Sequence, residues 1–186
     1  MPPGADFCQK DSTACARVVY YYKCFGYALA GSARFVKEEP TMQIRPMTLQ
    51  DKDAVLPMVA ALYQTPAVEH PAPDAIRERA FLDAVGENPH VQGFLLEENG
   101  QPAGFAYLTY FYSCEAAGNV VMLEEFFVKD SCRSKGLGRQ FLDWLYAAYP
   151  DAVRFRLDIT RGNPAAHLYE RCGFRFLDCD QMAFDR

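Results

Sequence analysis

The sequence predicts an α/β fold in which a mixed sheet is flanked by helices, and three observations carry this prediction. Segments with alternating apolar residues take turns with segments of helical spacing, in the order strand, two helices, three strands, helix, strand, helix, strand. Hydrophobic residues make up 50% and charged residues 23% of the 186 residues, which is typical of a globular chain. The regular pattern begins near Met42, so we expect residues 1–41 to be an N-terminal extension, outside the core, and residues 42–186 to be the domain.

The net charge of −5 argues against a dedicated nucleic-acid binder, which normally carries a basic face. A membrane partner is not expected, because the apolar stretch at residues 18–33 is interrupted by Lys23 and is shorter than the roughly 20 residues of a spanning helix. Lys23 also opposes the alternative interpretation of this stretch as a signal peptide. The seven cysteines contain no C-x-x-C pair and the three histidines are far apart, so we expect no metal site and a reducing, cytoplasmic location.

The first strand and the first two helices are predicted between residues 42 and 85. Residues 42–45 alternate as a short strand does, and Pro46 closes it. Thr48 and Asp51 offer N-terminal caps for the helix that follows. A second helix is predicted at residues 73–85. The apolar positions of the two helices are Val55, Met58, Val59 and Leu62, then Ile76, Ala80, Phe81 and Ala84.

Three strands follow, at residues 91–97, 103–112 and 119–128. The turn between the first two contains Asn99 and Gly100, a pair that accepts positive φ and is typical of hairpins. The middle strand is rich in aromatic residues, which favour strands.

The remaining elements alternate between helix and strand. We expect a helix at residues 137–149, because its apolar residues recur at helical spacing, and a half-buried strand at 153–159. A short helix at 164–172 is ended by Gly173 in the usual C-terminal capping position. Two strands, at 174–177 and 181–184, are predicted to close the chain.

The stretch at residues 123–139 carries the clearest chemical signal. A strand ends, a turn rich in glycine and basic residues follows, and a helix begins. The first N–H groups of a helix have no partner within the helix, and the helix dipole adds positive charge, so this point suits a phosphate or pyrophosphate. Gly136 and Gly138 would let the backbone approach such a ligand. The spacing fits neither the P-loop nor the dinucleotide pattern, since Phe stands at position 141, and a plain strand–turn–helix is the alternative.

Over about residues 43–180, the sequence resembles the GNAT family of N-acetyltransferases. Four segments match the family's motifs in the right order: Ile44-Arg45-Pro46, Gly104-Phe105-Ala106, Arg133-x-x-Gly136-x-Gly138, and LYERCGF at residues 168–174. The resemblance implies a GNAT-type α/β fold with a mixed, mostly antiparallel twisted sheet whose central parallel strands splay apart. It also implies that acetyl-CoA lies in the gap as the acetyl donor.

The resemblance also assigns cofactor-binding residues by motif position. The last strand residues before the turn would pair with the pantetheine of acetyl-CoA, and the turn would hold its pyrophosphate. Asn163 is a further candidate, although it lies six residues before Tyr169, where seven is common in the family. The cofactor-binding residues are then Phe126, Phe127, Val128, Arg133, Ser134, Lys135, Gly136, Leu137, Gly138, Arg139 and Asn163.

The catalytic candidates are Tyr169, Glu124 and Glu125. Tyr169 matches the family tyrosine that protonates the leaving thiolate, a step that needs a general acid. Leu123-Glu124-Glu125-Phe126-Phe127-Val128 resembles the diamine (spermidine/spermine) acetyltransferases, which implies Glu124 as the base and Glu125 as a residue that binds the cationic substrate. Which of the two is the base stays open, because adjacent strand residues face opposite sides unless a bulge intervenes.

We therefore expect a cytoplasmic N-acetyltransferase that moves an acetyl group from acetyl-CoA to a primary amine of a small molecule, with a polyamine as one option. Segments 132–134 and 160–162 depart from the polyamine enzymes, which leaves other acceptors open: a protein N-terminus, an amino acid or an antibiotic amine. A non-catalytic acyl-CoA sensor is a further alternative. A covalent route through Cys132 or Cys172 has no partner histidine in the sequence. The oligomeric state is open, with a homodimer as one option.

Overall fold

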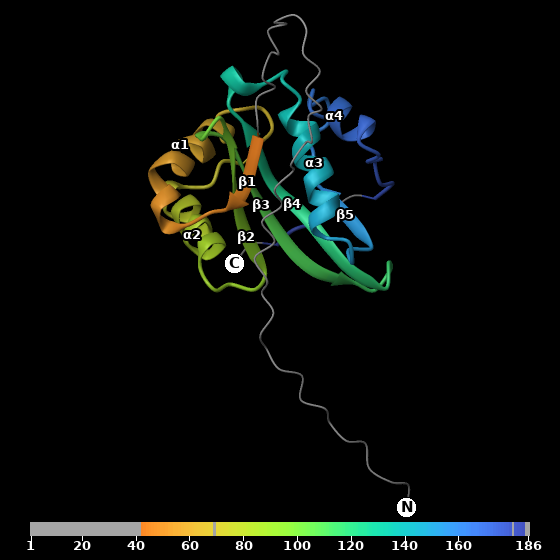
Figure 1. Ribbon diagram of the computed structural model, residues 1–186. Helices are drawn as coiled ribbons and strands as arrows, with labels where there is room; N and C mark the ends of the chain where they lie inside the picture. Colours follow the sequence, from red (N-terminus) through yellow and green to blue (C-terminus); the bar gives the residue numbers. More distant parts are fainter. Residues whose placement is uncertain (1–41, 69, 180, 185–186) are drawn as a thin grey trace, which may run out of the picture. The chain divides into compact units, whose positions relative to one another are not determined.

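The computed structural model describes residues 42–68, 70–179 and 181–184 (Figure 1). The expected N-terminal extension, residues 1–41, lies outside the described residues. Within the described part of the chain, no helix is both long enough and apolar enough to cross a membrane.

Five strands form one sheet, and they lie in it in chain order. The first four strands pair antiparallel, while the last two are parallel, so the predicted mixed and mostly antiparallel sheet is confirmed. The parallel pairing ends at Leu123 and Leu157, although the first of these two strands continues for another five residues. The strands are β1 (Met42–Pro46), β2 (Val91–Glu98), β3 (Gln101–Ser113), β4 (Gly118–Val128) and β5 (Arg154–Leu157).

Helices cover both faces of this sheet (Figure 1). The 3-10 turn η1 (Leu49–Asp51) leads into α1 (Lys52–Leu62), which covers one face together with α2 (Asp74–Val85). A second 3-10 turn, η2 (Asp130–Cys132), precedes α3 (Leu137–Ala148), and α3 covers the other face together with the short α4 (Ala166–Arg171). The predicted order of elements from residue 42 to the last helix is therefore confirmed.

The sheet separates two apolar cores. Strand residues alternate between them, so that Phe105 and Tyr107 of β3 face α1 and α2, whereas Ala106 and Leu108 face α3. The first core includes the predicted helix positions Val55, Met58, Val59, Leu62, Phe81 and Ala84, and the second includes Phe141, Leu142 and Leu145.

The two closing strands predicted at residues 174–177 and 181–184 do not form, and that prediction is wrong. Phe174 packs its ring against Tyr169 of α4, with the ring centroids 5.7 Å apart, so this residue covers the end of α4 and does not form a strand. The other apolar residues in this stretch are exposed, with Phe176 at 60% and Met182 at 99%. Their apolar–polar alternation is typical of a strand, but in the structure they do not pair with β5, although β5 is an edge strand of the sheet.

Candidate active site

Two neighbouring carboxylates, Glu124 and Glu125, lie on the same face of the sheet. The register between β3 and β4 shifts by one residue at Glu124, which is the extra residue of a β-bulge, and Tyr107 stands opposite Glu125. The Thr109 hydroxyl donates to Glu124 Oε1 over 2.6 Å. Thr109 lies two residues after Tyr107, so both side chains share the face that α1 and α2 cover. The bulge thus breaks the alternation that would otherwise send the two acids to opposite faces.

Glu125 accepts one hydrogen bond, from Tyr63, and lies near the charges of Arg77 and Glu124. The Tyr63 hydroxyl, at the end of α1, donates to Glu125 Oε1 over 2.6 Å. Glu125 Oε2 is buried and finds no hydrogen-bond donor among the described residues. Burial is the main cause that raises the pKa of Glu125; the charge of Glu124 adds to it, while the Tyr63 hydrogen bond and the Arg77 charge oppose it. The two acids therefore differ in exposure, since Glu124 is exposed and Glu125 is half-buried.

The edge of β4 beyond residue 123 carries backbone groups that no strand partner uses. The N–H of Lys129 donates to the Ala103 carbonyl over 2.8 Å, which is on the β3 side. Because the direction of these groups alternates along a strand, the N–H groups of Phe126 and Val128 point to the opposite edge, where β5 has stopped pairing. The Val128 carbonyl points the same way and accepts from Arg133 Nε over 2.9 Å.

The turn between β4 and α3 presents a row of free N–H groups. From Ser134 to Arg139, six consecutive backbone N–H groups find no acceptor among the described residues, and the first bond of α3 is from Gln140 to the Gly136 carbonyl. Gly136 has φ of +85°, in the left-handed region that glycine accepts without strain. Free N–H groups at the start of a helix are well suited to bind a phosphate.

The basic side chains of this turn are paired with acids of the same chain. Arg133 Nη1 lies 2.7 Å from Asp130, Lys135 Nζ lies 2.8 Å from Glu98, and Arg139 Nε lies 3.0 Å from Asp143. These are exposed pairs, each of small net value. In this conformation, the backbone of the turn offers more free donors to an anion than its side chains do.

Gly138 has a role that the sequence did not indicate. It is the second residue of α3, and a Cβ built on it would stand 2.7 Å from Leu168 Cδ2 of α4. The residue therefore lets α3 and α4 pack closely, whether or not a ligand also approaches it.

Tyr169 lies on the face of the sheet opposite the two acids. It belongs to α4 and packs against the core beneath α3. Burial raises the pKa of Tyr169 to about 12, so its hydroxyl keeps its proton at neutral pH. The structure thus brings Glu124 and Glu125 together, and it places Tyr169 on the other side of the β4 strand.

Asn163 shapes the turn that leads into α4. Its side-chain Oδ1 accepts from the Ala165 N–H over 2.9 Å, and its own N–H donates to the Thr160 carbonyl. These bonds explain an asparagine at this position by local structure alone.

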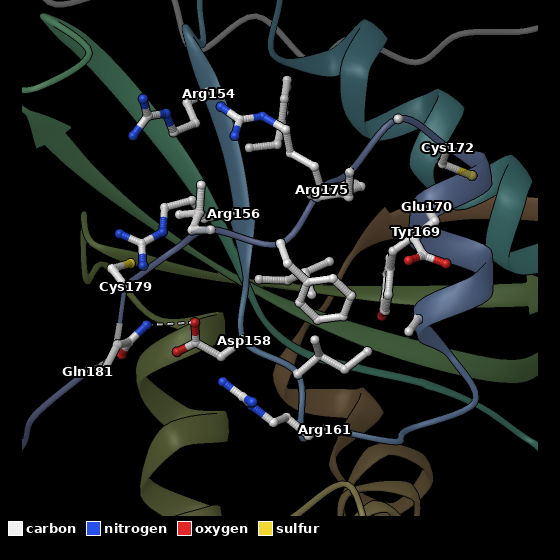
Figure 2. A pocket seen from close by; sticks show the side chains of 18 of the residues that line it. Arg154, Arg156, Asp158, Arg161, Tyr169, Glu170, Cys172, Arg175, Cys179 and Gln181 are labelled. Carbon is white, nitrogen blue, oxygen red and sulfur yellow. Dashed lines mark hydrogen bonds between the residues drawn. The ribbon is translucent and has the colours of Figure 1, made fainter.

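A pocket of about 560 Å³ lies between β5, α4 and the residues after Gly173 (Figure 2). Arg154, Arg156 and Arg175 gather at one end, and Tyr169 forms part of the opposite wall. Gln181 closes another side through a 2.8 Å bond to Asp158. The chain here crosses in front of β5 without pairing to it, at the place where the closing strands were expected.

Comparison with known proteins identifies the family. A sequence model of the acetyltransferase (GNAT) family matches residues 56–174. The chain belongs to this family. The expected enzyme class, an N-acetyltransferase that uses acetyl-CoA as its donor, is confirmed at this level. No curated protein sequence gives a significant match.

Solved structures with the same fold include several acetyltransferases. A possible acetyltransferase from Clostridium difficile 630 gives a TM-score of 0.67 at 15% identity, with 78% of this chain and 97% of that chain covered. Glucosamine-6-phosphate N-acetyltransferase from Arabidopsis thaliana gives a TM-score of 0.59 at 19% identity, with 77% of this chain and 98% of that chain covered. An aminoglycoside N-acetyltransferase in complex with CoA gives a TM-score of 0.62 at 20% identity, with 81% of this chain and 97% of that chain covered. At these identities the likeness shows the fold alone.

Three side chains around the acids of this GNAT chain escaped the sequence analysis: Tyr63, Tyr107 and Thr109. Tyr63 follows Val59 by four residues, so its spacing indicates the apolar face of α1, where part of it does lie. Its contact with Glu125 spans 62 residues of sequence, and no local pattern signals such a contact. Tyr107 and Thr109 alternate as ordinary strand residues, and only the register with β4 places them beside the acids.

Proposed function

We propose that this GNAT enzyme acetylates the primary amine of a small cationic molecule in the cytoplasm, with Glu124 and Glu125 forming the acceptor side of its active site. The observation that carries this proposal is the bulge in β4, which turns both carboxylates to one face, next to the strand edge that lies free beyond Leu123. Two adjacent negative charges on one face attract an ammonium group.

The free donors on the other side of the bulge fit acetyl-CoA. The N–H group of Phe126 would pair with the pantetheine, and the N–H groups of residues 134–139 would hold the pyrophosphate. Arg133, Lys135 and Arg139 would exchange their present acidic partners for phosphate oxygens. Acetyl-CoA supplies the activated acetyl group. The Phe127 side chain belongs to the α1 core, and its ring centroid lies 5.5 Å from the Arg133 Cζ atom. This side chain therefore packs in the core and does not face the ligand.

The residues then divide the proton transfers between them. Glu124 is exposed and takes the proton from the acceptor ammonium, which leaves a neutral amine able to attack. The Val128 N–H stabilises the negative charge that develops on the carbonyl oxygen. Tyr169 donates its hydroxyl proton to the departing sulfur. Glu125 adds negative charge that holds the acceptor, and it is the second candidate for the base because burial raises its pKa.

The groups around Glu124 and Glu125 bear on the class of acceptor. Both acids suit a polyamine through ion pairing, and the half-buried Tyr63 ring, already in cation–π contact with Arg77, lies beside them. Arg77, however, adds a positive charge near Glu125 and disfavours a second ammonium group there. Asn163 as a cofactor ligand and a homodimeric state stay proposals that rest on the family resemblance.

An acetyl-transfer screen that measures free CoA release tests the proposal. The panel holds spermidine, amino acids, aminoglycosides and a peptide with a free N-terminus. Turnover of a small cationic amine, abolished or strongly reduced in Glu124→Gln, is the expected result. Turnover of the peptide alone would favour a protein substrate, and acetyl-CoA binding without release of CoA on any acceptor would favour a sensor.

A further inference from the structure

Tyr63 stands at a junction between α1, α2 and the acids of β4. It follows α1 directly, where its N–H bonds to the Val59 carbonyl, and its hydroxyl reaches Glu125 Oε1 at 2.6 Å. The Arg77 guanidinium of α2 lies over its ring, with Cζ 5.4 Å from the centroid. Asp74 forms an ion pair with Arg77. The ring is therefore fixed from behind while its hydroxyl points at the carboxylate.

The two carboxylate oxygens of Glu125 differ in their hydrogen bonding. Oε1 accepts the Tyr63 hydroxyl, whereas Oε2 has no donor among the described residues. The Tyr107 hydroxyl, on the strand opposite, is likewise buried and unpaired in the described chain. A buried carboxylate oxygen that lacks a donor is costly, on the order of 1–3 kcal/mol or more, so a cationic donor brought to it is bound favourably.

We propose that Tyr63 is a positioning residue for Glu125, one that fixes Oε1 and keeps the carboxylate ionised, so that Glu125 presents negative charge to the acceptor ammonium. This inference rests on the proposed function, in which Glu125 holds the acceptor. It adds a residue outside the motif segments, delivered by a different layer of the fold.

The charged and titratable groups that face Glu125 are Tyr63, Arg77, Tyr107 and Glu124. Burial and the Glu124 charge favour the protonated, neutral form of Glu125. The Tyr63 hydrogen bond and the Arg77 charge favour the ionised form. Removing the Tyr63 hydroxyl takes away one of the two opposing effects, so the pKa of Glu125 rises further. The carboxylate then loses its charge at a higher pH than in the wild type.

The first test measures this titration without any acceptor. Protein labelled with ¹³C at the glutamate carboxyl carbon is titrated by NMR, and the Glu125 signal is assigned by its loss in Glu125→Gln. The matched control is Tyr110→Phe, which also removes a partly buried tyrosine hydroxyl. Tyr110 belongs to β3, bonds to the Tyr149 hydroxyl at 2.6 Å and lies in the opposite core. A higher pKa in Tyr63→Phe and an unchanged one in Tyr110→Phe are expected. An unchanged Glu125 pKa in a folded Tyr63→Phe protein overturns the proposal.

The second test separates KM from kcat, with spermidine as the probe acceptor. We expect Tyr63→Phe to raise the spermidine KM about tenfold at pH 6, equivalent to about 1.4 kcal/mol, with a smaller rise at pH 8 and nearly constant kcat and acetyl-CoA KM. An unchanged spermidine KM beside a large rise in Glu125→Gln overturns the proposal for Tyr63. An unchanged KM in Glu125→Gln itself instead contradicts the proposed role of Glu125, and no turnover of spermidine contradicts a polyamine acceptor. In both cases the NMR titration still decides whether Tyr63 sets the charge of Glu125.

Discussion

Leu168 of α4 fills the space that a side chain on Gly138 of α3 would need, with its Cδ2 atom 2.7 Å from an ideal Cβ. The same glycine belongs to the Arg133-x-x-Gly136-x-Gly138 motif, where a close approach of backbone to pyrophosphate is the expected reason for it. The structure supplies a packing reason as well. The two reasons make different predictions for a double variant.

We expect Gly138→Val to weaken acetyl-CoA binding at least tenfold, or about 1.4 kcal/mol, because the new side chain pushes the start of α3 away from α4. Adding Leu168→Ala opens the space again. Isothermal calorimetry should then show part of the affinity restored if packing is the cause. A double variant as weak as Gly138→Val, with a wild-type melting temperature, would assign the glycine to the ligand instead.

Tyr169→Phe should lower kcat by about 10²–10⁴-fold, the usual cost of losing a general acid, because only the donated proton is removed. With a pKa of about 12, Tyr169 stays protonated across the working range, so its loss should leave the shape of the pH–rate profile below pH 10 unchanged. The acetyl-CoA affinity should stay constant. Tyr146→Phe is the matched control, since that hydroxyl only donates to the Cys172 carbonyl at 3.0 Å. Retention of more than half of kcat in Tyr169→Phe, with chemistry rate-limiting, contradicts the assignment.

The carboxylate pair predicts opposite effects in two isosteric variants. Glu124→Gln should lose activity most at low pH, where the acceptor is charged and needs a base, and raising the pH should partly rescue it. Glu125→Gln should mainly raise the acceptor KM. Profiles of kcat/KM against pH for both variants decide the roles. If rescue by high pH appears in Glu125→Gln and not in Glu124→Gln, the two roles are exchanged.

Asp51 should make the stability of the fold sensitive to acid. The Arg45 guanidinium binds it at 2.7 Å and, as the main cause, lowers the pKa of Asp51 from 3.8 to about 2. A carboxyl whose pKa is lowered in the folded state stabilises that state fully above its unfolded pKa and loses this effect as the pH falls from about 4 to 2. Asp51→Asn should cost about 2 kcal/mol of unfolding free energy at pH 7 and flatten the pH dependence in that window.

Urea unfolding at several pH values measures this effect. Asp83→Asn, which breaks an exposed helix pair with Arg79, should cost no more than about 0.5 kcal/mol. Equal losses in the two variants would show that burial of Asp51 adds nothing.

A protein that starts at Met42 should fold and bind acetyl-CoA, because the strand and helix pattern of the sequence begins there. Thermal unfolding and calorimetry of the truncated and full chains test this. A large drop in melting temperature, or lost binding, would show that residues 1–41 contribute to the domain.

The sequence predicts well those elements that are specified by residues close together along the chain. The Asn99-Gly100 turn, the apolar positions of α1 and α3 and the Gly173 cap of α4 are local signals, and the structure agrees with each. Residues 174–184 fail because alternation describes only how a strand would present its side chains. It does not show that the segment will pair, and here the outer edge of β5 stays unpaired in the described chain while Phe176 and Met182 are exposed.

The candidate site divides in the same way. Glu124, Glu125 and the turn before α3 lie in one continuous segment, so a motif locates them. The side chains that set their chemistry, Tyr63 and Thr109, come from α1 and β3, and a hydrogen bond across 62 residues depends on how helix and sheet pack together.

As the extra residue of the bulge, Glu124 also reverses which sheet face the odd- and even-numbered residues of β4 point to. Before the bulge, the odd-numbered Val121 and Leu123 face the α3 core; after it, the even-numbered Phe126 does, while Phe127 faces the α1 core. Because Glu124 is the extra residue, deleting it would remove the bulge and restore simple alternation, with Phe126 still in the α3 core and Phe127 still in the α1 core. The fold should therefore accept this deletion, and its cost should fall on the acid pair, because a single carboxylate would then remain on the face that α1 and α2 cover.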